Sequence, residues 1–192
     1  MHERILAGAI ELIQQNGIKF TMADLAAQLG MSKRTLYEHF SSKEELIGTI
    51  IDRSLTEMKE QEALIAADPR LDPIEKLRVL LCLTPEEFRL GGLRLLHDVK
   101  RHLPGQWQKI DHFLREEWAT ICSVIEEGIA SGQIRPINLP VFIQMYVGCL
   151  QQLIDQRFLA TQSLNLSEAL EEMASIMLSG ITADHTTKEG SS

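Results

Sequence analysis

The chain has 192 residues and a formal net charge of −8 at pH 7, which excludes the uniformly basic surface of a protein that coats nucleic acid. Its length accommodates one moderate domain, or a small domain followed by a larger one, with a packed core. No apolar run approaches the roughly 18 residues that cross a bilayer, and the N-terminus does not resemble a signal peptide, so we expect a cytoplasmic protein without membrane attachment.

The first predicted helix spans Glu3–Gln15, where apolar residues recur on one face and Gly17 follows the end. A second helix begins at Thr21, because Thr21 and Asp24 have the types and spacing of a capping box, in which each side chain bonds the backbone of the other. This helix should end just before Gly30, since glycine readily adopts the left-handed conformation that terminates helices.

A third helix is predicted at Lys33–Phe40, with Ser32 as its N-cap. Two helices joined by about three residues form a helix-turn-helix. The first turn of the second of these helices carries Lys33 and Arg34, although the N-terminal end of a helix dipole favours acidic side chains. A negatively charged partner outside the chain would explain this arrangement.

A fourth helix begins after Ser42, where Ser42 and Glu45 again fit a capping box and Lys43 takes the first helical position. Free backbone N–H groups with an added lysine form a favourable site for phosphate. Tyr37 and His39, on the preceding helix, could also reach a backbone phosphate. The segment therefore points to a polyanion as the partner.

An isolated capping box usually does no more than start a helix, and Lys33, Arg34 and Lys43 could be ordinary solvated charges. Two such boxes, a glycine turn of the right length and cations opposed to helix dipoles within one segment instead favour nucleic-acid binding. Residues 1–52 carry a net charge of −2, whereas residues 31–43 carry +2. We therefore expect weak binding to random DNA and a clear loss of binding as salt rises.

A nearly ungapped pattern runs through this region: Phe20-Thr21-Met22-Ala23-Asp24-Leu25-Ala26, then Leu29-Gly30-Met31-Ser32-Lys33-Arg34-Thr35-Leu36-Tyr37-Glu38-His39-Phe40, then Ser42-Lys43-Glu44-Glu45-Leu46. The pattern resembles the DNA-binding region of the TetR family. The resemblance covers about the first fifty residues, and the remainder is similar only in length, helical pattern and a few glycines. It implies an all-α homodimer, usually a repressor that a small ligand releases from DNA.

The resemblance also implies which side chains contact DNA. Residues matching phosphate-binding positions of the family set the register, and those at the start of the recognition helix face base edges and set the sequence. Arg34 is the best candidate for reading guanine, whereas Ala23 replaces a polar or basic residue of some relatives, so little base reading is expected from the first helix of the motif. The implied phosphate contacts are Thr21, Tyr37, His39 and Lys43. The predicted DNA-binding residues are Thr21, Ser32, Lys33, Arg34, Thr35, Tyr37, His39 and Lys43.

The rest of the chain is predicted to be helical, without a strand pattern or repeat. The expected organisation is a helix-turn-helix domain at residues 1–46, a helical ligand-binding and dimerisation domain at residues 47–181, and a disordered tail at residues 182–192. The fourth helix should link the two domains. The expected later helices are Lys43–Ala66, one from Pro73 to about Leu83, one starting near Thr84, one ending near Leu103, then Gln106–Ala130, Val141–Leu159 and Ser167–Leu178.

The last two predicted helices are apolar over a broad face. Their side chains could form an intramolecular core or a four-helix bundle between two subunits, and Gly148 and Gly180 would allow close approach. A dimer also follows from DNA reading, because two recognition helices related by a two-fold axis read a palindrome. The predicted interface residues are Phe142, Met145, Cys149, Leu153, Leu170, Met173 and Met177.

Aromatic or polar residues on the central helices are candidates for an effector pocket, although each alone is more often a core residue. The spacing of the histidines does not match a metal site, and the three widely spaced cysteines indicate buried thiols rather than disulfides or metal ligands. We expect no cofactor and no metal, and the effector stays unknown. The candidate pocket residues are Phe88, His97, Trp107, Trp118 and Tyr146.

Three alternative functions differ from this interpretation. Paired acids at Glu116-Glu117 and Glu126-Glu127 could suggest an enzyme, but adjacent residues on a helix point about 100° apart, and no nucleophile motif or phosphate loop is present. A helical ligand- or partner-binding module without DNA binding is the second alternative, which the intact basic segment argues against. Activation, the third, is as compatible with these residues as repression.

Overall fold

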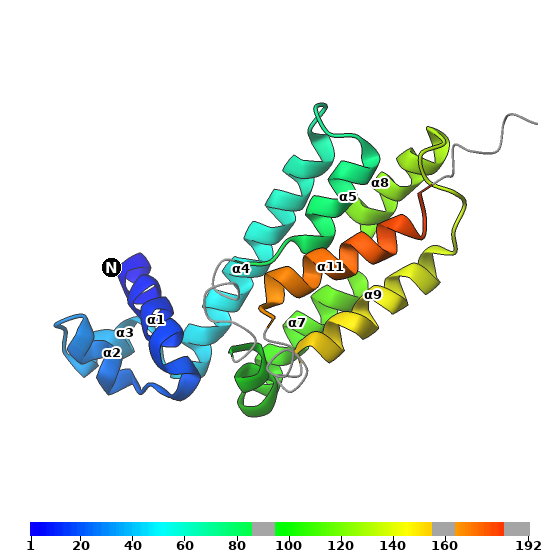
Figure 1. The fold of residues 1–192 in the computed structure, drawn as a ribbon. Coiled ribbons are helices and arrows are strands. Elements are labelled where there is room, and N and C mark those ends of the chain that lie inside the picture. The colour runs from blue at the N-terminus through cyan, green and yellow to red at the C-terminus, as the bar shows by residue number, and fades with distance from the viewer. Residues whose placement is uncertain (86–94, 155–163, 183–192) are drawn as a thin grey trace, which may run out of the picture.

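The computed structural model describes residues 1–85, 95–154 and 164–182 and is almost entirely helical there (Figure 1). Within these ranges no strand forms, and a single isolated antiparallel bridge joins Ile134 to Thr182. The all-α prediction is therefore confirmed. The helices are α1 (His2–Asn16), the short 3-10 helix η1 (Gly17–Lys19), α2 (Met22–Gln28), α3 (Lys33–His39), α4 (Lys43–Ala67), α5 (Pro73–Cys82), residues 95–102, α7 (Pro104–Glu116), α8 (Ala119–Ala130), α9 (Leu139–Ile154) and α11 (Leu166–Ser179).

Helices α1, α2 and α3 and the first turns of α4 form the head, at one end of the molecule (Figure 1). The predicted apolar face of α1 is buried as expected. Gly8 on α1 lets α2 approach closely, because a Cβ atom at residue 8 would lie 2.8 Å from Cδ2 of Leu29. The side chains of the head that are no more than 1% exposed are Ile5, Ala9, Leu25, Leu36, Phe40, Leu46 and Ile47.

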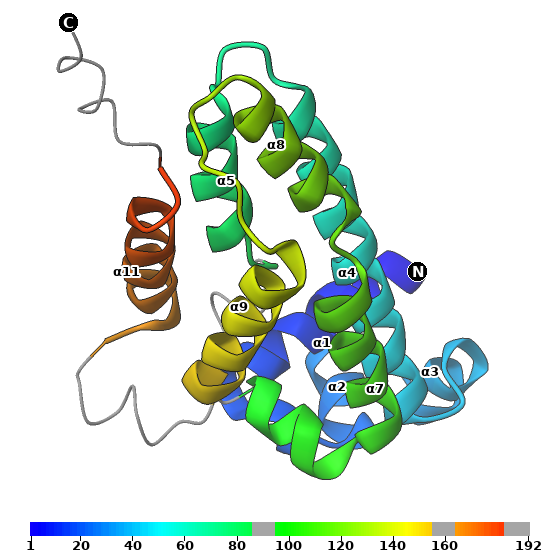
Figure 2. The same cartoon turned by 90° about the vertical axis from the view of Figure 1, so that its right-hand side faces the viewer.

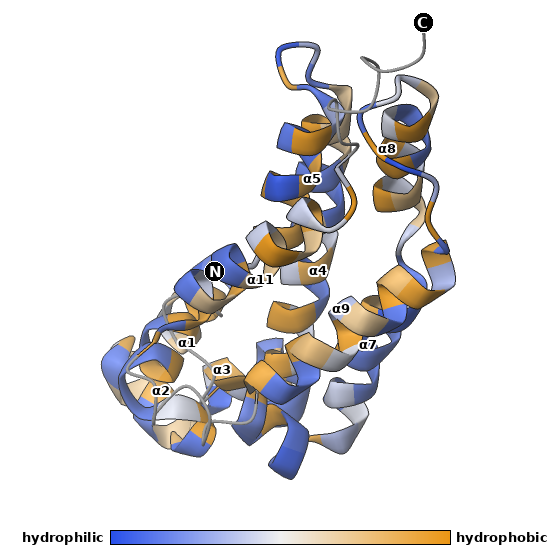
Figure 3. Ribbon diagram, turned by 45° about the vertical axis from the view of Figure 1, so that its right-hand side comes forward, coloured by the Kyte–Doolittle hydropathy of each residue, from blue (hydrophilic) through white to orange (hydrophobic). Residues whose placement is uncertain are grey.

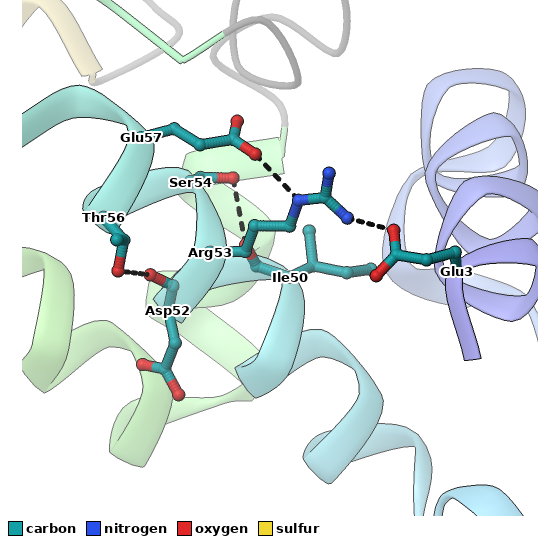
Figure 4. A network of polar contacts seen from close by, with 7 residues as sticks. All are labelled: Glu3, Ile50, Asp52, Arg53, Ser54, Thr56 and Glu57. Carbon is teal, nitrogen blue, oxygen red and sulfur yellow. Dashed lines mark hydrogen bonds and ion pairs between the residues drawn. The ribbon is translucent and has the colours of Figure 1, made fainter. Parts of the chain in front are cut away.

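Helix α4 is 25 residues long and continues from the head into the remaining helices, which form the body (Figure 2). Its N-terminal turns bury Leu46 and Ile47, and its later turns contact α5, α7 and α8. Arg53 fastens α4 to α1, since its guanidinium pairs with Glu3 and with Glu57 one turn further along α4 (Figure 4). The predicted link between head and body is thus one continuous helix.

Helix α7 packs along α4 where α4 leaves the head. Gly48 makes this contact close, because a Cβ atom there would lie 2.7 Å from Oε1 of Gln106. One turn later, the ammonium of Lys109 pairs with Asp52, with Nζ 2.6 Å from Oδ2. Close packing and an ion pair therefore join the two helices at the base of the head.

The helix predicted at Gln106–Ala130 is two helices, α7 and α8, which break at Glu117 and Trp118. The indole Nε1 of Trp118 donates to the carbonyl oxygen of Leu114 at 2.8 Å, and its ring packs edge-on against Tyr146 with centroids 5.2 Å apart. Burying this large side chain turns the backbone out of the helix. The prediction was wrong because the partner, Tyr146, lies on a distant helix.

Two helix starts differ from the predictions. Helix α7 begins at Pro104 instead of Gln106, and α9 begins at Leu139 instead of Val141, so that Pro140 lies in the first turn of α9. Asn138 caps α9, accepting from the backbone N–H of Val141 at 3.1 Å. Proline suits the first turn of a helix because the N–H that it lacks would have no intrahelical partner there.

Some predictions fall outside the described residues. They are the side chain of Phe88, the end of the helix predicted at Val141–Leu159, most of the helix expected after Thr84, and the tail at residues 182–192, of which Thr182 alone is described. In the described part of the chain, none of the helices combines the length and the hydropathy needed to cross a membrane.

Candidate nucleic-acid interface and effector cavity

The turn between α2 and α3 is a Schellman motif. The N–H of Met31 donates to the carbonyl of Ala26 and that of Gly30 to the carbonyl of Ala27, at 3.0 and 3.1 Å. Gly30 has φ +62°, the left-handed conformation expected for it. Arg4 of α1 also donates through Nη2 to the carbonyl of Leu29 at 2.6 Å. The angle between α2 and α3 is therefore fixed by backbone bonds and by α1.

The capping box at the start of α2 is complete. The hydroxyl of Thr21 accepts from the N–H of Asp24, and the Asp24 carboxylate accepts from both the N–H and the hydroxyl of Thr21, each at 2.8 Å. These bonds hold the pKa of the Asp24 carboxyl below its usual range. A phosphate at Thr21 would thus compete with Asp24 for the donors.

Helix α3 buries Leu36 and Phe40 in the head and leaves its other face to solvent. The Arg34 side chain is 90% exposed, and its Nε donates to Glu38 at 3.2 Å, a pair one turn apart. Thr35 is half-buried, and its hydroxyl lies 2.9 Å from that of the N-cap, Ser32. The exposed predicted residues on and beside α3 are Ser32, Lys33, Arg34, Tyr37 and His39.

The ammonium of Lys43 is largely bonded within the protein, whereas a phosphate-binding lysine was expected to be free. Its ammonium donates to the backbone carbonyls of Ile18 and of Phe20, the latter at 2.7 Å, and lies 4.9 Å from the centroid of the Phe20 ring. Burial lowers its pKa. Two of the three ammonium N–H groups therefore tie the start of α4 to the loop before α2, and one is left for an outside acceptor.

The second predicted capping box, Ser42 with Glu45, is only half formed. The Ser42 hydroxyl accepts from the N–H of Glu45 at 3.0 Å, as expected. The Glu45 carboxylate, however, bonds mainly Ser41, accepting from its hydroxyl and its N–H. These two bonds, with a smaller contribution from the N–H of Ser42, lower the pKa of Glu45. The acid of the predicted box is thus held chiefly by Ser41 and only weakly by the N–H of Ser42.

A mostly apolar cavity of about 90 Å³ lies in the body, between α4, α7 and the helices behind them. An engineered cavity of about 150 Å³ holds benzene, so a ligand larger than benzene must displace the lining side chains. The residues that line it are Leu55, Met58, Glu62, Leu80, Leu83, Thr84, Pro85, Leu96, Ile110, Phe113, Leu114, Glu117, Trp118, Ile121, Tyr146, Leu150, Leu166 and Leu170.

Trp118 and Tyr146, two of the predicted pocket residues, line this cavity. His97 and Trp107 do not: Nδ1 of His97 lies 3.9 Å from Asp98, and the ring of Trp107 lies 5.1 Å from the ammonium of Lys100. Sequence patterns singled out aromatic and polar residues on the central helices, whereas the cavity depends on which faces of those helices converge.

Glu62 is a lining residue that the sequence analysis missed. It lies on α4 at helical spacing from Leu55 and Met58, so an acid within the apolar stripe of that helix was the available signal. Glu62 is only 7% exposed, and its burial raises the pKa of the carboxyl. The buried hydroxyl of Tyr146 does not bond it, since it donates to the carbonyl of Leu81 at 2.6 Å.

A groove between α9 and α11 exposes apolar side chains on the far side of the body, where the ribbon of α9 is mostly orange or pale (Figure 3). Of the predicted interface residues, Phe142 and Leu170 are buried in the protomer and belong to its core instead. Met145 and Cys149 are exposed, and Leu153, Met173 and Met177 are half-buried. Val141 and Ile176, which were not predicted, expose 54% and 66% of their surface beside Met145 and Met177.

Comparisons with known proteins give a consistent result. Residues 5–50 match the model of the bacterial regulatory proteins, tetR family. The chain is 37% identical over 184 residues to a Bacillus subtilis (strain 168) protein described as the uncharacterized HTH-type transcriptional regulator YvaF, an alignment that covers 96% of this chain and 97% of the relative.

Two solved structures share the fold. One is the transcriptional regulator FadR from Bacillus subtilis in complex with stearoyl-CoA, with 22% identity and a TM-score of 0.66 over 94% of this chain and 100% of the other. The second is the ketosteroid transcriptional regulator KstR2 of Mycobacterium tuberculosis, with 20% identity and a TM-score of 0.64 over 95% of each chain.

Proposed function

Because this chain belongs to the TetR family of bacterial regulatory proteins and is a DNA-binding transcriptional regulator, we propose that it acts as a repressor, which binds a palindromic operator as a homodimer and leaves it when a small ligand binds. The observation that carries the proposal is the exposed basic face of α3, fixed on a rigid helix-turn-helix. The second alternative, a helical module without DNA binding, does not account for this face.

Base reading is proposed for Lys33, Arg34 and Thr35 at the start of α3. The Glu38 contact uses Nε of Arg34, so the two terminal amino groups are left to bond O6 and N7 of a guanine. Phosphate contacts are proposed for Tyr37, His39, the remaining N–H of Lys43, and Thr21 once its donors leave Asp24. These contacts set the register of the head on the duplex.

The groove between α9 and α11 is the proposed dimer interface. Val141, Met145 and Ile176 expose apolar surface there, and a Cβ atom at Gly148 would meet nothing within 4 Å inside the protomer. A second copy of the chain, related by a two-fold axis, would cover this surface and place two copies of α3 on successive turns of the major groove.

The cavity in the body is the proposed effector site. The relatives of known structure are described with stearoyl-CoA or as a ketosteroid regulator, and both molecules have large apolar parts that suit an apolar lining. A ligand that exceeds the empty cavity displaces lining residues on α4 and α7, the two helices that also meet at the base of the head. It lowers DNA affinity only if it binds the displaced conformation more tightly.

Selection of binding sites from random duplex DNA by the purified protein tests the proposal. We expect an enriched palindrome that Arg34→Ala does not enrich. Arg70→Ala is the matched control, because Arg70 is 85% exposed and also pairs with a neighbouring acid, Asp68, but lies in the body. No enrichment by the wild-type protein at low salt would favour the helical module without DNA binding.

A further inference from the structure

Glu62 is buried without a partner. In the described part of the chain, its carboxyl group makes no hydrogen bond and no ion pair, although its side chain faces the cavity and is 7% exposed. The nearby ammonium of Lys59 is engaged by Glu117, at 2.9 Å. A buried carboxylate in an apolar site costs free energy unless a partner is present. Within the described residues, the Glu62 carboxylate therefore lacks a hydrogen-bonded partner that would offset the cost of its burial.

The charges around the cavity determine whether a cation or an anion would be favoured beside Glu62. Glu62 and Glu117 are the charged residues among the described lining residues, and Lys59, half exposed beside them, balances one of the two carboxylates. Because no lysine, arginine or histidine is among the lining residues that the structure describes, an anionic head group placed inside would face there a carboxylate without a counter-charge. A cation would pair with Glu62.

Among the described lining residues of the cavity are three with aromatic rings: Phe113, Trp118 and Tyr146. The faces of aromatic rings attract cations, and most strongly where water is excluded. The Tyr146 hydroxyl is already bonded to a backbone carbonyl, so the ring, and not a competing donor, faces the bound molecule. Apolar walls, aromatic rings and a single unpaired carboxylate together match the chemistry of an amine or quaternary ammonium on an apolar body.

We propose that the effector is a lipophilic cation whose positively charged nitrogen pairs with Glu62 inside the cavity. The inference rests on the proposed function, since it takes this cavity as the effector site. The apolar body of the cation fills the space between α4 and α7, and the nitrogen replaces the missing partner of the carboxylate.

The proposal implies a proton linkage. Burial favours the protonated form of Glu62, the Lys59 ammonium opposes this, and Glu117 reinforces it. Tyr146 on α9 also faces Glu62: its own burial raises its pKa most, and the charges of Cys82, at the end of α5, and of Glu62 add to this. A permanently charged cation binds the ionised form of Glu62, so its affinity rises with pH through the Glu62 titration and proton release accompanies binding.

Calorimetry on the full chain without DNA tests the inference. The probes are butyltrimethylammonium, butanol and butyrate, which share a chain and differ in charge. We expect the cation to bind at least about tenfold more tightly than the alcohol at pH 8, and butyrate to bind most weakly. In Glu62→Gln the cation should lose about tenfold in affinity and its pH dependence, whereas the affinity for butanol changes less than twofold.

Glu60→Gln is the control, because it removes the same charge from an exposed position on the same helix. Equal affinity for butanol and the cation, tighter binding of butyrate, or unchanged cation binding in Glu62→Gln would each overturn the inference. Release of operator DNA is measured separately. Cation binding that depends on Glu62 without DNA release would count against the proposed effector mechanism and leave the cation site standing.

Discussion

Gly48 of α4 and Gln106 of α7 meet so closely that a Cβ atom on residue 48 would lie 2.7 Å from Oε1 of Gln106. This contact lies where α4 leaves the head, and one turn further along, Lys109 pairs with Asp52. The same two helices then diverge to line the cavity with Leu55, Met58 and Glu62 on one side and Ile110, Phe113 and Leu114 on the other. In the proposed mechanism, packing at Gly48 couples the cavity to the DNA-binding head.

Larger side chains at Gly48 should disturb this coupling in proportion to their size. Gly48→Ala requires only the end of the flexible Gln106 side chain to move and gains up to about 1 kcal/mol of helix propensity, so we expect little net change in stability. Gly48→Leu forces α7 away and should cost about 1 to 3 kcal/mol. Chemical denaturation measures both. Adding Gln106→Ala to Gly48→Leu should recover part of the lost stability. If it does not, the destabilisation does not arise from the contact with Gln106.

Arg34→Ala should weaken operator binding by about 1 to 3 kcal/mol, because it removes the proposed contact to a guanine edge. Binding to random DNA should change little, so the specificity ratio falls. Fluorescence anisotropy with the selected operator and a scrambled duplex of equal length gives both constants. An equal loss on both duplexes would mean that Arg34 contacts phosphate instead.

Lys43→Met and Tyr37→Phe should separate stability from DNA binding. Lys43→Met leaves the carbonyls of Ile18 and Phe20 without their donor, which should cost about 1 to 3 kcal/mol of stability and also weaken DNA binding. Tyr37 is exposed, so Tyr37→Phe should weaken DNA binding without lowering Tm. Thermal unfolding gives Tm, and fluorescence anisotropy on the same preparations gives the affinity for DNA. A normal Tm in Lys43→Met would show that the lysine does not hold the loop.

Ile176→Glu should produce monomers with reduced operator affinity, because it places a charge in the proposed dimer interface. Leu64→Glu is the matched control, since Leu64 is exposed to almost the same extent, 65% against 66%, but lies on α4 outside the groove. Sedimentation velocity at micromolar concentration reports the oligomeric state. If both variants stay dimeric, the interface lies on another face.

Glu62→Gln should stabilise the ligand-free protein at neutral pH and not at acidic pH. Burial raises the pKa of Glu62 above its ordinary value of 4.5, so the folded state holds the proton more tightly than the unfolded chain. The stability linked to this proton is fully present below pH 4.5 and is lost as pH rises through the folded pKa. Urea unfolding at several pH values should show the two proteins diverging as pH rises, and parallel curves would contradict the linkage.

Local signals explain how much of this architecture could be predicted. The capping box of Thr21 with Asp24 and the left-handed turn at Gly30 involve residues within a few positions of one another, so the sequence specifies them directly. The break at Trp118 depends on Tyr146 in another helix, and the partnerless state of Glu62 depends on which faces surround it. No window of sequence contains those neighbours.

Glu45 shows that a local sequence pattern can also predict the wrong hydrogen-bond partner. Its type and spacing from Ser42 match a capping box, yet the carboxylate bonds the N–H and hydroxyl of Ser41, because a second hydroxyl lies within its reach. The proposed DNA-binding residues follow from the family pattern, which records their positions. The occupied donors of Lys43 were not predictable, because they depend on a loop some twenty residues earlier in the chain.

The length of α4 determines how far the head would move when the helix tilts. At 1.5 Å per residue, its 25 residues span about 37 Å. A tilt of about 5° about its far end therefore moves the N-terminal turn, and the head fastened to it by Arg53 and Lys43, by about 3 Å, close to the 3.4 Å rise of one base pair. In the proposed mechanism, a change in the cavity no larger than a side-chain displacement would be enough to put the two recognition helices of a dimer out of step with the turn of the duplex.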